Sequence, residues 1–260
     1  KLNPTNCATA TVAVVVTAAP IAAGADTPAS VNGASGNPSV TNAFANDTLN
    51  GAPLVIADVD VTIESPASNA GVALDPATGT VSVAPGTPAG TYTITYKICE
   101  KLNPANCATS SVTVVVDAAP IAAGADSLAP VNGKAGGTDV IDVFANDTLN
   151  GAPVTLSSIS ASVTAPATPI NGGPVPVLDP ATGLVDVPAG TPAGSYTIAY
   201  EICETLNPSN CASSSVTIMV TAAPIAAGAD TPASVNGASG NPSVVNAFAN
   251  DTLNGAPLVI

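Results

Sequence analysis

The residues best equipped for chemistry in this sequence are five cysteines, and they recur at one spacing. Cys99 and Cys107 stand in YKICEKLNPANCAT, and Cys203 and Cys211 stand in YEICETLNPSNCAS. Cys7 stands in KLNPTNCAT, which repeats the tail of the same phrase. Two cysteines at a fixed separation can form a disulfide or give two ligands to a metal ion. Because the chain has no histidine to complete a ligand set, we favour disulfides.

Other reactive side chains are scarce and scattered. The chain has no histidine and no arginine, and its aspartates, serines and tyrosines do not gather in a recurring constellation. General acid–base catalysis needs a positioned proton carrier, so the sequence predicts a protein that is not an enzyme. A stapling isopeptide bond is also disfavoured, because the second whole repeat has only Lys134, next to Gly133 in a turn-like stretch.

The charge balance is strongly acidic, with a net charge of -14 over 260 residues. Such a chain repels phosphate backbones and anionic membrane surfaces, so we expect no nucleic-acid partner. Hydrophobic residues make up 46% of the chain, mostly Ala and Val, yet no apolar run reaches membrane-spanning length. We therefore expect no membrane insertion within this segment.

The sequence is periodic. AAPIAAGAD starts at Ala18, Ala118 and Ala222, and FANDTLNGAP recurs in step with it. The repeats predict four parts: residues 1–17 as the last strand of a preceding repeat, 18–117 and 118–221 as whole repeats, and 222–260 as the beginning of another. Residues 17–56 and 221–260 differ only at Thr41 and Val245, whereas the middle repeat differs more. This alternation predicts a two-repeat period within a longer array.

Each repeat is rich in residues that favour strands and turns. Stretches such as PSVTNAF, PLVIADVDVTIE, GTVSVA and GTYTITYKICE are separated by turn signals such as VNGASGNP, NDTLNGAP and DPATG. About seven short strands per repeat, and no helix, predict an all-β chain of tandem immunoglobulin-like antiparallel sandwiches. The junction VTVVVDAAPIAAGAD has no flexible Gly/Ser linker, so we expect successive repeats to stack end to end.

The period of two along the strands places the cysteines. In TYTITYKIC, Tyr92 and Ile98 share one face, and Cys99 shares the other face with threonines. The strand that begins at Cys107 alternates in the same way, so both cysteines lie on the polar face. A Cys99–Cys107 bridge would therefore close a hairpin from outside, and Cys203–Cys211 repeats the design. The partner of Cys7 would lie before residue 1.

The repeat landmarks also resemble a known family. The Asp-bearing entry strand, the FANDT box, the GTVSV hairpin, the GTYTITY strand and the closing ATSSVTVVV resemble bacterial immunoglobulin-like and cadherin-like tandem repeats. Those repeats build large cell-surface adhesins and surface filaments. The resemblance covers the whole chain and implies an extracellular, cell-surface location, which disulfides also favour.

The resemblance raises the question of calcium, because many members of the family bind calcium between repeats. Here the entry strand offers a single acid, and the later acids of the box are replaced by Leu49, Asn50 and Ala52. A hard cation needs six to eight oxygens, so we expect at most a weak site and favour an Asx-type turn at the box. The candidate ligands are Asp26, Asn46, Asp47, Asp126, Asn146 and Asp147.

Two further patterns have plain explanations. Asp58 and Asp60 share one strand face, but the next repeat has no acids there, so we interpret them as solvated charges. NDT at Asn46 fits an N-glycosylation pattern, which is a weak signal in a chain that resembles bacterial proteins.

The sequence thus favours a structural protein over a binding module. We expect self-association into an extracellular filament or fibre, without a cofactor. One alternative is the stalk of a long adhesin that binds a host or neighbouring-cell ligand through absent domains. A carbohydrate-binding array is a second alternative, but it needs exposed aromatics, and the parity of the tyrosines places them in the core.

Overall fold

The computed structural model describes residues 4–260, in which the chain divides into two compact units, Lys1–Ala118 (unit 1) and Ala119–Ile260 (unit 2). The regular structure in these residues is β-strand except for one short 3-10 helix, η1 (Ile56–Asp58). The prediction of an all-β chain is therefore confirmed. The described residues contain no helix long and apolar enough to span a membrane.

Unit 1 contains a four-stranded and a three-stranded sheet, with a third small sheet beside them. The four-stranded sheet has the order β2 (Val31–Asn32), β10 (Cys107–Asp117), β9 (Gly90–Glu100), β6 (Val59–Ser65). The second sheet has the order β3 (Asn37–Asn42), β8 (Thr80–Val83), β7 (Val72–Leu74). The small sheet joins β1 (Ile21–Ala22), β4 (Thr48–Leu49) and β5 (Ala52–Pro53).

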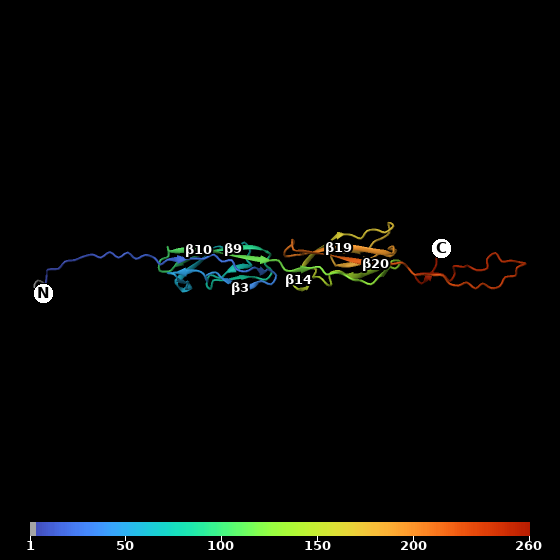
Figure 1. Ribbon diagram of the computed structural model, residues 1–260, viewed down its shortest axis with the longest axis horizontal. Helices are drawn as coiled ribbons and strands as arrows, with labels where there is room; N and C mark the ends of the chain where they lie inside the picture. Colours follow the sequence, from blue (N-terminus) through green and yellow to red (C-terminus); the bar gives the residue numbers. More distant parts are fainter. Residues whose placement is uncertain (1–3) are drawn as a thin grey trace. The chain divides into compact units, whose positions relative to one another are not determined.

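The two larger sheets of unit 1 face each other across one core. Figure 1 shows β9 and β10 in one layer and β3 in the opposite layer. Tyr92 and Ile94 on β9 and Val114 on β10 pack in one cluster with Val72 and Val81 from the other sheet. Each such side chain stabilises the fold by about 1.5–3 kcal/mol on burial. The predicted alternation along β9 and β10 is confirmed, because this face is buried and the cysteine face is not.

The strand order is that of an immunoglobulin-like sandwich. The groups β6-β9-β10 and β3-β8-β7 correspond to the C-F-G and B-E-D groups of that fold. A tyrosine near the start of the strand F equivalent marks the fold further: the Tyr92 hydroxyl donates to the carbonyl oxygen of Pro88 at 2.9 Å. Tyr196 makes the same bond to Pro192 in unit 2.

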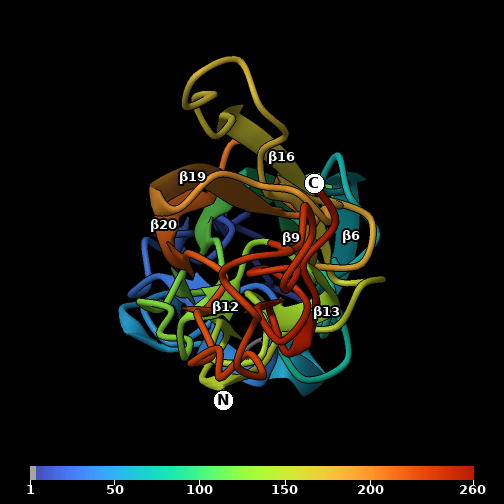
Figure 2. The same ribbon diagram turned by 90° about the vertical axis from the view of Figure 1, so that its right-hand side faces the viewer.

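Unit 2 repeats this architecture. Its four-stranded sheet has the order β12 (Val131–Asn132), β20 (Cys211–Thr221), β19 (Gly194–Glu204), β16 (Ile159–Ala165). Its three-stranded sheets are β13 (Gly137–Asp142), β18 (Leu184–Val187), β17 (Val177–Leu178) and β11 (Ile121–Ala122), β14 (Thr148–Leu149), β15 (Ala152–Pro153). Figure 2 shows β19 beside β20, with β16 on the other side of β19.

The structure corrects three sequence assignments. VNGASGNP, which we predicted to be a turn, contains β2, which pairs in parallel with β10. The predicted strand 53–64 is interrupted by η1, where the amide of Asp58 bonds to the carbonyl of Val55 at 2.9 Å. The predicted turn NDTLNGAP forms the β4–β5 hairpin, because Asn50 (φ 56°) and Gly51 (φ 74°) supply the two left-handed residues that such a turn requires.

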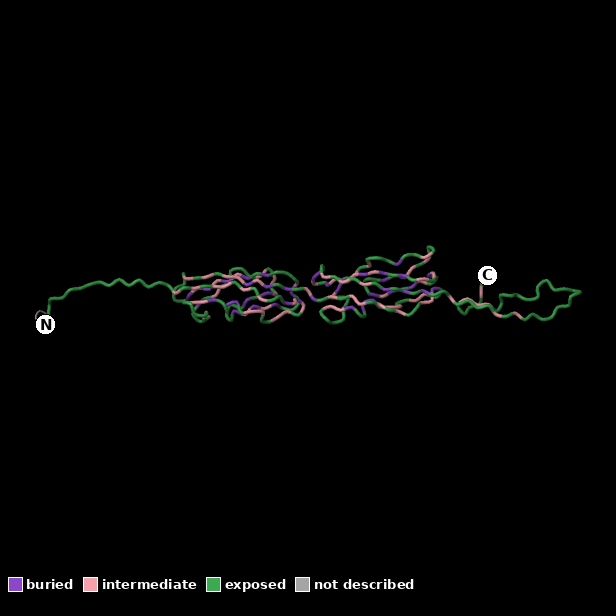
Figure 3. The backbone as a smooth tube through the Cα atoms, in the orientation of Figure 1, coloured by how far each residue is buried: buried purple, intermediate pink, exposed green. Residues whose placement is uncertain are grey.

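The segments outside the two sandwiches contain little regular structure. Residues 4–17 repeat the sequence of β10 but form no strand and are exposed, as Figure 3 shows. Residues 222–260 contain only the small sheet β21 (Ile225–Ala226), β22 (Thr252–Leu253), β23 (Ala256–Pro257). A strand needs a neighbour to satisfy its backbone, and in the described residues these segments pair with no strand of the larger sheets.

Candidate functional site

The features that recur in both units lie inside the units and hold each one together. The outermost is a disulfide in the β9–β10 hairpin. Cys99 on β9 and Cys107 on β10 are direct partners in the strand register and are joined by a disulfide, as are Cys203 and Cys211. Cys107 is exposed and Cys99 half-buried, so the bridge lies on the outer face of the sheet. Cys7 is a free, exposed thiol.

The hairpin loop beside the disulfide is tied to the entry of its own unit. The side-chain amide of Asn106 donates to the carbonyl of Ala19 at 2.7 Å and to Oε2 of Glu100 at 2.8 Å. Glu100 is buried, so its carboxylate needs this partner. Asn210, Ala119 and Glu204 form the same arrangement in unit 2. We call each trio the loop lock.

The loop lock escaped our sequence reasoning although a signal was present. Asn106 stands directly before Cys107, and the same NPxNC phrase places Asn210 before Cys211 and Asn6 before Cys7. Glu100 is likewise the last residue of an ICE phrase, and Glu204 is the last residue of the second one. From the sequence, the recurrence of this phrase is attributed to the cysteines alone. A buried glutamate also requires its amide partner, so the same phrase must keep both the Glu and the Asn.

The cysteines are not a metal site in the described residues. Glu201, Cys203 and Cys211 lie close enough together for a metal ion to bridge them. The two sulfurs are bonded to each other, however, and thiolates are the species that bind metals.

A second recurring feature, the acid–tyrosine cluster, lies deeper in unit 1. Asp47 is 1% exposed and its carboxylate accepts bonds from the amide of Gly24 at 2.8 Å and the hydroxyl of Tyr96 at 3.0 Å. The Tyr96 hydroxyl also lies 2.8 Å from the carbonyl of Ala43. Because one hydroxyl has one proton, these acceptors share a single donor. The cluster joins the entry segment, the FANDT box and β9.

Asp26 lies beside this cluster. Its Oδ1 accepts a bond from the side-chain amide of Asn46 at 3.2 Å, while its Oδ2 is buried without a partner. Asn46 also donates to the carbonyl of Ala25 at 3.3 Å. A Cβ on Gly24 would lie 2.6 Å from the Asn46 side chain, so a larger residue at this position would displace that side chain.

The environment of the cluster raises the pKa of both carboxyls. Burial and the nearby charge of Asp47 raise the pKa of Asp26 to about 6, and burial raises the pKa of Asp47. Burial, followed by the charge of Asp47, raises the pKa of the Tyr96 hydroxyl as well. In the described residues no lysine is bonded to either carboxyl. Burial is therefore the largest cause of the raised pKa values, and no bound cation offsets it.

Unit 2 contains the same groups with a different set of hydrogen-bond contacts. The hydroxyl of Tyr200 donates to Oδ2 of Asp126 at 3.0 Å, and the amide of Gly124 donates to Asp147 at 2.7 Å. The buried oxygen without a partner is now Oδ2 of Asp147. Burial raises the pKa of Asp126 to about 6 and also raises that of Asp147. In each unit, therefore, one carboxylate oxygen of the acid pair is buried without a partner.

The cluster does not fit a calcium ion. The Gly24 amide and the Tyr96 hydroxyl are directed at Asp47, and Asn46 presents its amide to Asp26. These hydrogen-bond donors occupy oxygens that a cation would need, and two carboxylates fall short of the usual ligand set. We therefore assign no calcium ion to Asp26, Asn46 and Asp47, or to their equivalents Asp126, Asn146 and Asp147.

The Asx-turn interpretation of Asp47 was wrong. Its side chain does not fold back on the next residues but reaches Gly24, 23 residues earlier. The local turn is made instead by Asn42, whose Oδ1 accepts a bond from the amide of Phe44 at 2.8 Å. Asn46, the candidate glycosylation acceptor, uses its amide within the cluster. Asp58 and Asp60 are exposed.

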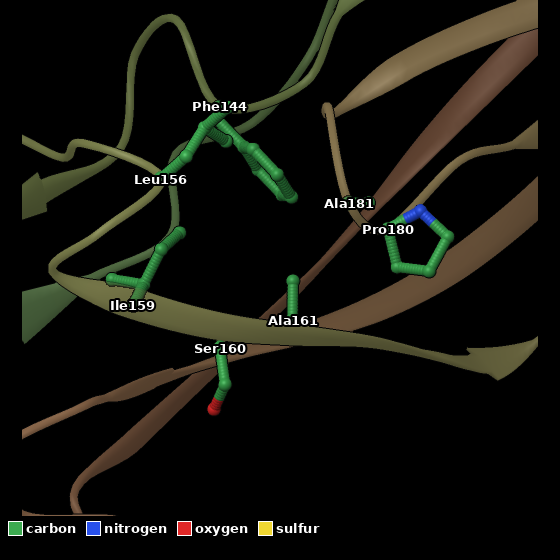
Figure 4. Close-up of a pocket in the computed structure, with 7 residues that line it drawn as sticks. All are labelled: Phe144, Leu156, Ile159, Ser160, Ala161, Pro180 and Ala181. Carbon is green, nitrogen blue, oxygen red and sulfur yellow. The ribbon is translucent and has the colours of Figure 1, made fainter.

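An open pocket of about 400 Å³ lies in unit 2 between β16 and the turn that follows β17. Figure 4 shows Ile159 and Ala161 directed toward the pocket and Ser160 directed away from it. Phe144, Leu156, Ile159, Ser160, Ala161, Pro180 and Ala181 line it. None of these side chains titrates or carries charge, so the pocket offers apolar contact and no catalytic chemistry.

Comparisons with known proteins identify no family. No protein-family model matches the chain, and no curated protein does so. The human desmocollin-1 ectodomain is similar at 10% identity and a TM-score of 0.33, over 78% of this chain and 42% of that one.

Mouse cadherin-23 EC22–24 is similar at 15% identity and a TM-score of 0.31, over 76% and 62% of the two chains. An endo-fucoidan hydrolase from glycoside hydrolase family 107 is similar at 14% identity and a TM-score of 0.27, over 64% and 24%. The chain thus spans less than two thirds of each of these proteins. The strand order described above defines the fold, and likenesses of this degree say nothing about function.

Proposed function

We propose that this chain is a structural, non-enzymatic segment of an extracellular surface filament or fibre, built from tandem disulfide-bonded sandwiches. The observation that carries the proposal is that both units repeat internal bonding: the disulfide, the loop lock and the acid–tyrosine cluster. A protein selected to bind a ligand would repeat an exposed constellation of side chains. Here the repeated residues face inward or hold a hairpin closed.

The disulfides support an extracellular location, since such bonds persist in oxidising compartments. Each sandwich has a small core, with only one Phe and two Tyr as aromatic residues. Small cores contribute little stability, so a disulfide cross-link in each unit is expected. The burial of these same aromatics disfavours a carbohydrate-binding array, which would display them on an exposed face.

Electron microscopy of the native material tests the proposal. Continuous fibres thicker than one sandwich, with a repeat of one or two units, are the expected result. Single beaded threads would instead favour the stalk of an adhesin, whose ligand-binding domain lies elsewhere. The same images taken with a calcium chelator test the assignment of no calcium, and we expect the fibres to be unchanged.

A further inference from the structure

Most edge strands in the described part of the chain have a feature that blocks pairing with another chain. Edge strands use shortness, proline, bulges or charge for this purpose. β1, β2, β5, β7 and their equivalents in unit 2 are only two or three residues long. β3 contains Pro38, β13 contains Asp139 at φ 50°, and the pairing of each is interrupted by a bulge.

The long edge strands β6 and β16 differ sharply although they occupy the same place. β6 reads VDVTIES and has two acids, Asp60 and Glu64, the latter bonded to Lys97 at 2.9 Å. β16 reads ISASVTA and has no charge and no proline. Its only irregularity is a bulge after Val163, which leaves the five residues Ile159–Val163 in regular register.

The backbone of β16 has hydrogen-bonding groups available on its outer side. The amide of Thr205 donates to the carbonyl of Ser158, which therefore faces β19. Since antiparallel residues alternate between neighbours, Ile159, Ala161 and Val163 direct their N–H and C=O groups away from β19. Among the described residues, no strand lies on that side in the sheet order.

Apolar surface adjoins this edge. Leu156 is 59% exposed, and the pocket of Figure 4 opens beside Ile159 and Ala161. The equivalent residue in unit 1, Ile56, is half-buried. A partner that covers the pocket and Leu156 would remove apolar surface from water. This burial would contribute favourable free energy to association at the β16 edge.

We propose that β16 is a lateral docking edge for β16 of a second copy of this chain. An antiparallel pair about a two-fold axis at Ala161 places Ile159 of one copy opposite Val163 of the other, and both copies use the same residues. The uncharged sequence makes the strand self-compatible, whereas two β6 strands would bring acids together. The inference rests on the proposed function and names the surface through which the filament would associate laterally.

The contact is expected to be weak for one pair of edges. Five paired residues with flanking apolar surface fall below the size of a standard interface. Many edges along two arrays would bind with avidity, because each contact raises the effective concentration of the next. The net charge of -14 repels the copies, and Glu201 opposite Ser162 adds local repulsion, so salt should strengthen association.

Analytical ultracentrifugation of the 260-residue chain in a Cys7→Ser background tests the proposal without thiol-linked dimers. We expect a monomer–dimer equilibrium with a dissociation constant between about 10 µM and 1 mM that tightens with salt. Ser160→Asp and Ser160→Lys should both weaken it by about tenfold or more, since the two like charges would be diagonal neighbours on one face of the paired strands. Asp stands at the equivalent position of β6, so the fold should tolerate it, and thermal melting of each variant checks this.

Substitutions of opposite charge at Ser160 distinguish repulsion at the paired edges from an effect of the net charge of the chain. If net charge governed association, Ser160→Lys would strengthen it and Ser160→Asp would weaken it. The reciprocal variant Asp60→Ser with Glu64→Thr should create a second edge and strengthen association. Amide hydrogen exchange at Ala161 should slow as concentration rises.

A monomeric chain at about 1 mM, or association unaffected by Ser160→Lys, would overturn the edge pairing. Fibres observed by microscopy in the native material would leave the proposed function standing in that case. The opposite result is single beaded threads in the native material, with dimers in solution that depend on salt and on Ser160. It would overturn the proposed filament and support the pairing of β16 edges.

Discussion

The hydroxyl of Tyr96 lies 3.0 Å from Oδ2 of Asp47, and the two residues are 49 positions apart in the chain. The bond joins β9 to the segment before β4 inside the core. Tyr96→Phe keeps the ring and removes the donor, so we expect a loss of about 1–3 kcal/mol in the free energy of unfolding. Urea unfolding measures the loss. Ser82→Ala on β8, outside the cluster, is the control, and an equal loss in both variants would contradict the role of the bond.

The raised pKa values of Asp26 and Asp126 predict a pH dependence of stability. Both have a folded-state pKa of about 6 against an ordinary value of 3.8. The folded state therefore binds more protons than the unfolded state between these values, and stability falls as pH rises through this window. We expect a higher melting temperature at pH 4.5 than at pH 7. Asp26→Asn with Asp126→Asn should flatten the difference, and an unchanged slope would contradict the assignment.

The disulfides should stabilise each unit through the closed loop. The two cysteines are separated by eight positions, for which the chain-entropy model gives about 2–3 kcal/mol. We expect Cys99→Ser with Cys107→Ser to lower the free energy of unfolding of unit 1 by this amount, and Cys203→Ser with Cys211→Ser to do the same in unit 2. Without reductant, thiol labelling should modify Cys7 alone. Labelling of Cys99 in the folded protein would disprove the bridge.

The loop lock should matter as much as the disulfide beside it. Asn106→Ala leaves the buried Glu100 carboxylate without its amide partner and frees the carbonyl of Ala19, so we expect a loss of about 2–3 kcal/mol. Asn103→Ala in the same loop changes an exposed residue and should cost less than about 0.5 kcal/mol. Chemical denaturation of both variants decides the comparison, and similar midpoints would refute the lock.

Calcium should not stabilise the protein. Because donors already occupy three of the four carboxylate oxygens of the acid–tyrosine cluster in unit 1, millimolar calcium and a chelator should give the same melting temperature. Magnesium at equal ionic strength is the control for screening. A rise specific to calcium that Asp47→Asn abolishes would show that the cluster rearranges to bind the ion.

The sequence alone predicted the all-β class and the faces of the long strands. Tyr92, Ile94 and Cys99 could be assigned to faces because a strand has a strict period of two and one face must be buried. The spacing of the cysteines on adjacent strands followed from the same parity. These are local properties, and the repetition of the motif in each unit made them easy to recognise.

The remaining features depend on contacts between residues that are distant in sequence. Asp47 was assigned to a local turn because its true partners, Gly24 and Tyr96, are identified only when the sheets pack. The parallel pairing of β2 with β10 and the loop lock between Asn106 and Ala19 were missed for the same reason. Hydrophobic period and turn chemistry act within a few residues, whereas the partner of a buried polar group is decided by which segments the core brings together.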